Sequence, residues 1–158
     1  MAAPVLAPMT DLSDLVRPEA TLTGVSATNK KAALALIATA AAPLTGFDAR
    51  LLADKLAARE KLGSTGFGDG VAIPHARIDG LRDIGGVVIR LAQPVEFGAV
   101  DDLPVDLLFA LFSPVDAGAD HLKALARVSR RLRDRPFVAK LRGAGSHDAL
   151  YALLTDAA

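Results

Sequence analysis

One short segment of this sequence gathers around a single histidine the residue types that handle phosphate. Residues 59–77 read REKLGSTGFGDGVAIPHAR, and His75 follows a proline at the edge of a short apolar run. Two arginines, Arg59 and Arg77, stand at the ends of the segment. The glycines between them can adopt positive φ and let backbone N–H groups converge on an anion. The grouping predicts a site that receives a phosphoryl group and passes it on.

His75 is the candidate nucleophile of this segment. A neutral imidazole carries a lone pair near pH 7, and its attack on phosphorus forms a phosphoramidate that is labile enough to hand the group onward. An isolated histidine could equally be an ordinary residue at the end of a strand, but the density of glycines upstream favours a functional role. The segment has neither the Walker lysine nor GxGxxG, so no nucleotide is implied.

Other residues of the segment are candidates for binding the phosphate. The guanidinium of Arg59 can hold phosphate oxygens through its fork of N–H donors, although an arginine in the last turn of a helix can also be merely solvated. Arg77 is left open between a role in docking and an exposed surface position. The predicted loop contacts to phosphate are Ser64, Thr65, Gly66 and Gly68.

The sequence predicts different roles for the two remaining histidines. His121 opens a predicted helix, where backbone N–H groups and the imidazole could both meet a phosphoryl group; the alternative is a hydrogen-bonded histidine in the core. His147 has no recruiting neighbours, and we expect it to be structural or solvated. A zinc site is disfavoured because the histidines are scattered and cysteine is absent. A Ser-His-Asp hydrolase is disfavoured because the sequence has no GxSxG nucleophile elbow. We expect no cofactor and no metal.

Length, charge and hydropathy limit the class of protein. The 158 residues suffice for one domain with its own core, and we expect residues 1–10 to be a flexible leader and residues 11–158 one domain. The formal net charge is zero, so no electrostatic footprint for nucleic acid or an anionic membrane is present. No apolar run approaches the ~20 residues that cross a bilayer, and the N-terminus lacks a signal-peptide pattern. These features favour a cytoplasmic protein.

The elements that must position these residues can be placed from pattern. Residues 20–25 suggest an edge strand. A helix should follow, capped by Thr28 and ending near Pro43, and a second should run from Asp48 to Gly63. On this second helix the packed stripe ends at Arg59, which can therefore project toward the glycine-rich loop.

The second half of the chain alternates extended and helical segments. Apolar runs at residues 84–91 and 105–112 are continuous, which is typical of central strands covered on both faces, and a shorter strand is expected at 71–73. Helices are expected at 120–133, 135–142 and 146–155. The predicted fold is a single-domain α/β sandwich, with a small mixed β-sheet flanked by helices.

The segment REKLGSTGFGDGVAIPH resembles the active-site signature of the type-2 enzyme IIA (EIIA) domains of the bacterial phosphoenolpyruvate-dependent phosphotransferase system (PTS), the mannitol, fructose and nitrogen-regulatory group. The similarity continues through QPVEFGAVDDLPVDLLFALFSP, HLKALARVSRRLRD and LRGAGSHDALYALLTD. It covers the chain from about residue 20 to 158 and is strongest to the nitrogen-related branch.

This resemblance implies a phosphohistidine at His75, with Arg59 and His121 beside the imidazole. It also implies an α/β sandwich and delivery of phosphate by a small HPr-like histidine phosphocarrier protein. Relatives often carry a branched aliphatic residue in place of Phe67, and we expect this difference to reshape the docking rim.

Two roles remain open. One is a regulator of the nitrogen or potassium type, whose two phosphorylation states bind different target proteins. The other is an EIIA subunit that passes phosphate to the IIB protein of a sugar permease. The lack of a permease or IIB segment in the sequence favours the regulator.

Overall fold

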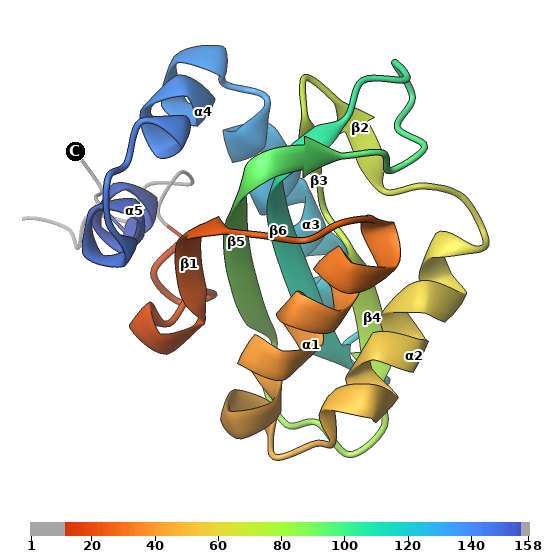
Figure 1. Cartoon of the computed structure of the whole chain (residues 1–158). Coiled ribbons are helices and arrows are strands. Elements are labelled where there is room, and N and C mark those ends of the chain that lie inside the picture. The colour runs from red at the N-terminus through yellow and green to blue at the C-terminus, as the bar shows by residue number, and fades with distance from the viewer. Residues whose placement is uncertain (1–11, 156–158) are drawn as a thin grey trace, which may run out of the picture.

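The computed structural model describes residues 12–155, and a mixed six-stranded β-sheet lies at its centre (Figure 1). The strands are β1 (Thr21–Val25), β2 (Gly66–Gly68), β3 (Val71–Ala72), β4 (His75–Ile78), β5 (Gly85–Val95) and β6 (Val105–Pro114). Their order is β1-β5-β6-β3-β2, with β4 also paired to β6. β5 and β6 are antiparallel, whereas β1 runs parallel to β5 and β3 and β4 run parallel to β6. The predicted mixed sheet is confirmed, with β1 at its edge.

Helices cover both faces of this sheet, as the predicted sandwich requires. The helices α1 (Lys30–Thr45) and α2 (Ala49–Glu60) pack on one face, in front of the sheet in Figure 1. On the other face pack α3 (Ala119–Leu132), α4 (Arg135–Arg142) and α5 (His147–Thr155). A short 3₁₀ helix, Pro18–Ala20, precedes β1. The predicted leader, residues 1–10, lies outside the described residues.

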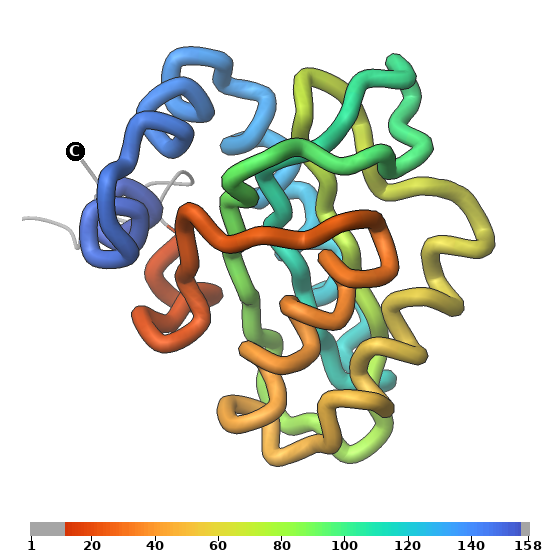
Figure 2. The backbone as a smooth tube through the Cα atoms, in the orientation of Figure 1, coloured from red at the N-terminus to blue at the C-terminus, as the bar shows by residue number. Residues whose placement is uncertain are grey.

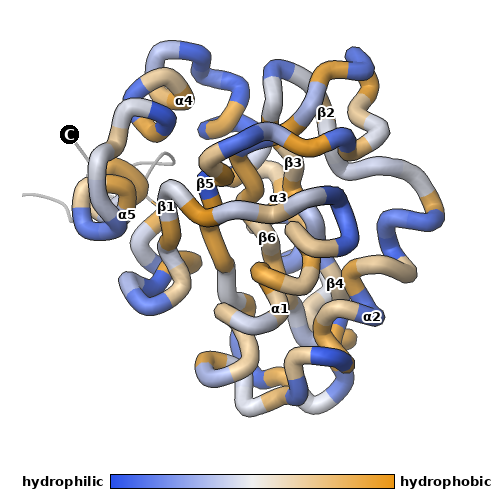
Figure 3. Tube along the Cα trace, in the orientation of Figure 1, coloured by the Kyte–Doolittle hydropathy of each residue, from blue (hydrophilic) through white to orange (hydrophobic). Residues whose placement is uncertain are grey.

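The two long strands are mainly apolar because each face of the sheet has its own core. On β5, Val87 and Ile89 pack in the core under α1 and α2, whereas Val88 packs in the core on the opposite face. On β6, Leu108 and Phe109 divide between the two cores in the same way. Figure 3 shows the resulting hydrophobic residues along both strands. The continuous apolar runs thus predicted the central strands correctly.

The first helix differs slightly from its prediction at both ends. Asn29, one residue after the predicted cap Thr28, caps α1 by accepting a hydrogen bond of 2.8 Å from the Ala32 N–H. The helix also includes Pro43 and ends at Thr45, with Gly46 (φ +78°) as its C-cap. A proline in the last turns costs one backbone hydrogen bond, which a long alanine-rich helix tolerates. The helix thus ends two residues beyond Pro43, close to the predicted position.

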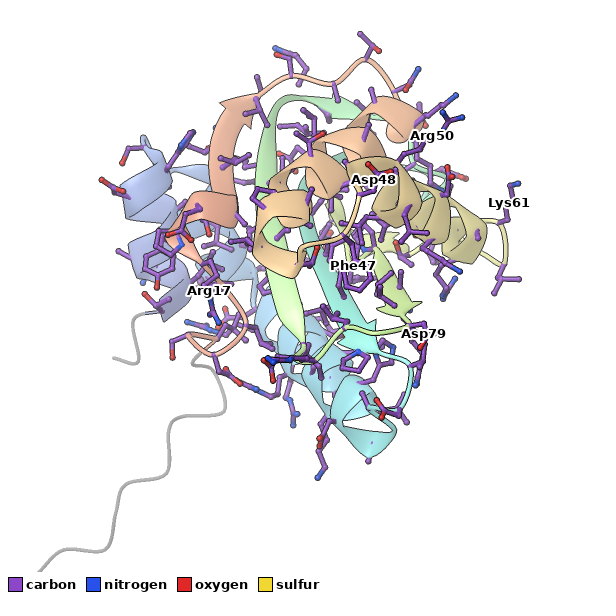
Figure 4. The ribbon with its side chains drawn as sticks, turned by 90° about the horizontal axis from the view of Figure 1, so that it is seen from below. Arg17, Phe47, Asp48, Arg50, Lys61 and Asp79 are labelled. Carbon is purple, nitrogen blue, oxygen red and sulfur yellow. The ribbon has the colours of Figure 1, made fainter. Side chains whose placement is uncertain are left out.

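An aromatic ring in the connection between α1 and α2 packs against the core and against Gly80. Phe47 lies in this connection. A Cβ added at Gly80 would lie 3.4 Å from the Phe47 ring, so the two residues are in close contact. Figure 4, viewed from below, shows Phe47 and Asp48 at this junction, while Lys61 at the far end of α2 projects away from the body of the molecule. The start of α2 therefore lies against the connection between β4 and β5.

The segment from the end of α2 to β4 carries the strands that the sequence did not predict. In Figure 2 the chain leaves α2 at the right of the view and returns to the sheet through β2. β2 and β4 have only three and four residues, too few for a hydrophobic period. β4 forms by pairing with β6, where His75 lies opposite Leu111. This pairing fixes His75 at the N-terminal end of a strand beside the centre of the sheet.

Candidate functional site

His75 lies in a pocket of about 320 Å³ between the end of α2, the start of β4 and the start of α3. Its lining is formed by Lys55, Ala58, Arg59, Leu62, His75, Ala76, Arg77 and His121. Three elements far apart in the sequence therefore meet at this point. Each is held by its own packing: α2 and α3 by apolar stripes against the sheet, and β4 by its ladder with β6.

The hydrogen bonds of His75 identify which ring nitrogen carries the lone pair. Nδ1 lies 2.8 Å from the carbonyl oxygen of Ile73, and since a carbonyl only accepts, Nδ1 must carry the proton. On the other side of the ring, the Nε–H of Arg59 donates to Nε2 at 3.2 Å. Both contacts require the same neutral tautomer. The lone pair of His75 is therefore on Nε2, which faces Arg59.

The surroundings of His75 also keep the ring neutral. Burial lowers the pKa of His75 below its ordinary value, and the positive charges of Arg59 and Arg77 act in the same direction. The hydrogen bond to Ile73 and the carboxylate of Glu60 oppose the shift but do not cancel it. At neutral pH the imidazole is a nucleophile rather than a cation.

Arg59 occupies the last turn of α2, where the packed stripe of that helix ends. Leu52 and Leu56 on the same stripe are fully buried, which confirms the predicted stripe. The Nη1 of Arg59 donates to the carbonyl of Gly63 at 3.0 Å. Within residues 12–155 its Nη2 has no hydrogen-bond partner. Arg59 therefore touches the lone pair of His75 while keeping a donor for a further anion.

His121 forms the opposite wall of the pocket from the first turn of α3. Its ring is 5.6 Å from the ring of His75, centroid to centroid, and the two planes are tilted by 56°. The residue is 4 % exposed, and its Nδ1 lies 2.6 Å from the hydroxyl of Ser113. Burial lowers the pKa of His121, with the nearby charge of Arg77 acting in the same direction. The structure thus brings His75, Arg59 and His121 together, as the sequence analysis expected; their chemical roles remain predictions.

Comparison with known proteins supplies the family. Residues 14–157 match the family model described as "Phosphoenolpyruvate-dependent sugar phosphotransferase system, EIIA 2". The chain belongs to this family. A nitrogen regulatory protein of Bradyrhizobium diazoefficiens is 48% identical over 143 residues, which cover 90% of this chain and 94% of that protein. The nitrogen regulatory protein of Escherichia coli is 41% identical over 147 residues, covering 92% and 90%.

A solved structure supports the same assignment at the level of the fold. The nitrogen regulatory protein IIA-Ntr from Neisseria meningitidis superimposes with a TM-score of 0.86 at 30% identity, covering 91% of this chain and 99% of that one. The sandwich described above is therefore the fold of the type-2 EIIA proteins.

Within this type-2 EIIA domain, the residues predicted to form a phosphate-binding loop are placed differently from that prediction. None of Ser64, Thr65, Gly66 and Gly68 is among the described residues that line the pocket of His75. The hydroxyl of Ser64 donates to the carbonyl of Phe97 at 2.8 Å, and the hydroxyl of Thr65 donates to the carboxylate of Glu60.

The two glycines have a packing role in β2 instead. Gly66 pairs with Ala72, and a Cβ at Gly66 would lie 2.8 Å from the Cβ of Ala99. Gly68 pairs with Val71 and has φ +117°. Glycine is thus required here for close packing and backbone conformation. In this structure the loop residues hold the segment in place rather than facing the imidazole.

Two residues in or beside the site, Glu60 and Lys55, were not assigned from the sequence, and a third, Arg77, was named there with its role left open. Glu60 is buried and binds the Lys30 ammonium at 2.9 Å as well as the backbone N–H of Thr65 at 3.1 Å, so it ties the loop to α1. Lys55 stands one turn before Arg59 on α2, a spacing that could have revealed it. Arg77 shares a face of β4 with His75 because side chains alternate along a strand, but β4 was not predicted.

Proposed function

We propose that this protein is a phosphoryl-relay component of a bacterial PTS that accepts phosphate on Nε2 of His75 and passes it on. The observation that carries the proposal is the fixed tautomer of His75. The Ile73 carbonyl holds the proton on Nδ1, so the lone pair stands on Nε2 beside the Arg59 guanidinium. Membership of the type-2 EIIA family supports the same chemistry.

The proposed reaction is an in-line exchange of one N–P bond for another. The Nε2 lone pair of His75 forms a bond to phosphorus as the bond from phosphorus to the donor's imidazole breaks. The electron pair of the breaking bond stays on the donor's ring nitrogen, so atoms and electrons balance between the two histidines. Nδ1–H of His75 keeps its hydrogen bond to Ile73 and disperses the positive charge that the ring acquires. Such transfers depend on positioning and electrostatics.

Arg59 is the proposed phosphate clamp. In the structure its Nε–H caps the lone pair that must attack, so this contact has to open as the phosphoryl group arrives. The Nη1 contact to Gly63 can persist while Nε and Nη2 turn to the phosphoryl oxygens. Guanidinium is suited to this role because its donors match two phosphate oxygens at once.

The proposed donor is an HPr-like histidine phosphocarrier protein in the cytoplasm. Leu62, which lines the pocket, is 83% exposed, and Leu122, the residue after His121, is 63% exposed; they offer apolar area on which such a protein could dock. Phe67, predicted to shape the docking rim, is half-buried and has the Arg133 guanidinium 5.6 Å from its ring centroid.

We propose that the main output is regulation of the nitrogen or potassium type. Support comes from the relatives named nitrogen regulatory proteins, which match over nearly their whole length. Phosphorylation adds about two negative charges beside the exposed apolar area, which is enough to change which target protein binds there.

A second role, as an EIIA subunit of a sugar permease, is favoured by another relative. The fructose-specific EIIA component of Haloferax volcanii is 36% identical over 103 residues, 65% of this chain and 67% of that one. In this role the phosphoryl group would continue to a IIB protein.

Reconstitution tests both the proposed phosphoryl relay and the proposed output. The chain is incubated with enzyme I, a phosphocarrier and labelled phosphoenolpyruvate, and acid-labile, alkali-stable label is followed on wild type and on His75→Gln. Label on wild type alone supports the relay. Affinity capture with the two phosphorylation states then separates the outputs. A target that binds one state only supports the regulator, and transfer of label to a IIB protein supports the transport role.

A further inference from the structure

Ser113 lies beneath the site at a position that the relay chemistry above does not use. It is in β6, fully buried, opposite Arg77 in the ladder between β4 and β6. Its hydroxyl is 2.6 Å from Nδ1 of His121. Within residues 12–155 this ring nitrogen is the one hydrogen-bond partner of the hydroxyl. A buried serine and a buried histidine therefore depend on each other for their hydrogen bonding.

The direction of this hydrogen bond follows from counting donors and acceptors. A serine hydroxyl has one proton to donate, and in a buried position that proton needs an acceptor. If Nδ1–H of His121 donated to Ser113, the hydroxyl proton would have no acceptor among the described residues, which is costly in the interior. If instead the hydroxyl donates, Nδ1 accepts and both groups are satisfied. The neutral ring then carries its proton on Nε2.

We infer that Ser113 is a positioning residue that holds His121 as the Nε2–H tautomer, so that this N–H can donate to the phosphoryl group on His75. The part of the inference that concerns phosphate rests on the function proposed above; the tautomer itself does not. Because Nδ1 is used by Ser113, Nε2 is the ring nitrogen of His121 that remains available to the pocket.

The two neighbouring histidines are consequently held in opposite tautomers. A carbonyl, Ile73, fixes the proton of His75 on Nδ1, and a hydroxyl, Ser113, fixes the proton of His121 on Nε2. One ring thus presents a lone pair that can attack phosphorus, and the other presents a donor for the oxygens of the same group. In the other tautomer, the Nε2 lone pair of His121 would face phosphoryl oxygens and repel them.

The tautomers can be measured directly in the unphosphorylated protein. The chain has three histidines, so long-range ¹H–¹⁵N spectra resolve each ring, with exposed His147 as the internal reference. At pH above 7.5 we expect the Nδ1–H pattern for His75 and the Nε2–H pattern for His121. An Nδ1–H pattern for His121 in wild type would overturn the inference whatever the protein's function is.

Variants at Ser113 test whether the serine controls this state. Ser113→Ala removes the donor with little change of volume, so the Nδ1 resonance of His121 should shift and the Nδ1–H tautomer should become populated. Ser113→Thr keeps the hydroxyl and should restore the wild-type pattern. An unchanged His121 spectrum in Ser113→Ala would contradict the role of Ser113, and if the threonine variant does not fold, the alanine spectrum decides.

The functional consequence is tested in the phosphorylated protein. Ser113→Ala should shorten the lifetime of phospho-His75 and lower the maximal transfer rate by about three- to tenfold, without changing the carrier concentration at half-maximal rate. In a His121→Ala background, Ser113→Ala should have no further effect on the rate, because the serine acts through that ring. Equal losses in both backgrounds would show that Ser113 acts through packing alone. Absence of any label on wild type would instead count against the proposed relay, leaving the tautomer measurement intact.

Discussion

At the scale of single residues, the chemistry of this site depends on which atoms of two histidines carry protons. His75 is kept neutral by burial and by nearby arginines, although its hydrogen bond to Ile73 favours the charged form. The net effect lowers the pKa of His75, so the lone pair on Nε2 stays available below the pH at which an exposed histidine would be half protonated.

This pKa shift predicts the pH dependence of phosphoryl transfer. As the pH falls from 8, the rate of labelling should reach half of its maximal value only below about pH 6.5, the ordinary pKa of histidine. Rapid-mixing measurements with phosphocarrier labelled beforehand would show this, with hydrolysis of the carrier measured in parallel as the control. A half-maximal rate at or above pH 6.5 would mean that His75 is not kept neutral as described.

The contacts of Arg59 predict how its variants behave. Arg59→Ala should lower the transfer rate by about 10²–10³-fold, the usual effect of removing a donor that stabilises transition-state charge, while the free energy of unfolding changes by less than about 1 kcal/mol. Arg59→Lys should recover only part of the rate because an ammonium lacks the planar fork.

Arg50 provides a matched control for these variants, since it is exposed at the other end of the same helix (Figure 4). Arg50→Ala should transfer at the wild-type rate. If Arg59→Ala does so too, Arg59 is only a surface side chain of α2.

At the scale of elements, the segment between α2 and β2 is held by a buried carboxylate. Glu60 binds Lys30 on α1 and both the N–H and the hydroxyl of Thr65, and this fixes the turn whose Gly63 carbonyl anchors Arg59. The sequence placed Thr65 in direct contact with phosphate. The structure connects it to the site through Glu60, and the direct contact with phosphate stays a prediction.

Thr65→Val distinguishes these two roles. Loss of a hydrogen bond to a buried carboxylate should lower the free energy of unfolding by about 1–2 kcal/mol, as measured by urea denaturation, with only a modest loss of transfer rate. Ser26→Ala, at an exposed loop position, serves as the control for losing a hydroxyl. Full stability combined with a large loss of transfer would restore the direct contact.

The extent to which these elements could be predicted from sequence follows from what stabilises them. β5 and β6 are recognisable because the two cores require apolar residues on both faces of these strands. The helices α3 to α5 begin within a residue of their predicted starts because their amphipathic periods are clear. β2 and β4 exist only through pairing with other strands, which no local pattern records.

The same holds for the residues of the site. His75 and Arg59 were visible from glycine density and helix spacing, whereas Glu60, Ser113 and the placement of Arg77 depend on contacts across elements.

At the scale of the whole molecule, the two buried histidines link stability to pH. Both His75 and His121 have a pKa lowered by burial, so between about pH 6.5 and their lower folded values the unfolded chain binds more protons than the folded one. By linkage, the free energy of unfolding therefore rises with pH in this window. As the pH falls through the window, the stability that the two neutral histidines contribute is lost.

Urea titrations at pH 7.5 and 5.5 test this linkage. Wild type should be less stable at pH 5.5, and the double variant His75→Gln/His121→Gln should show a smaller difference between the two pH values. An exposed-site variant, His147→Gln, should keep the wild-type difference. Equal pH dependence in wild type and the double variant would place the acid sensitivity at groups other than these two histidines.

Whether the whole molecule relays phosphate through one defined atom is decided most directly by locating the phosphoryl group. The ¹⁵N-labelled chain is phosphorylated through enzyme I and a phosphocarrier, and ³¹P–¹⁵N coupling is measured on the histidine side chains. The structure predicts coupling to Nε2 of His75, with Nδ1 of that ring unmodified. Coupling to Nδ1 of His75 or to either ring nitrogen of His121, or a chain that takes up no phosphate from the carrier, would contradict transfer through Nε2 of His75.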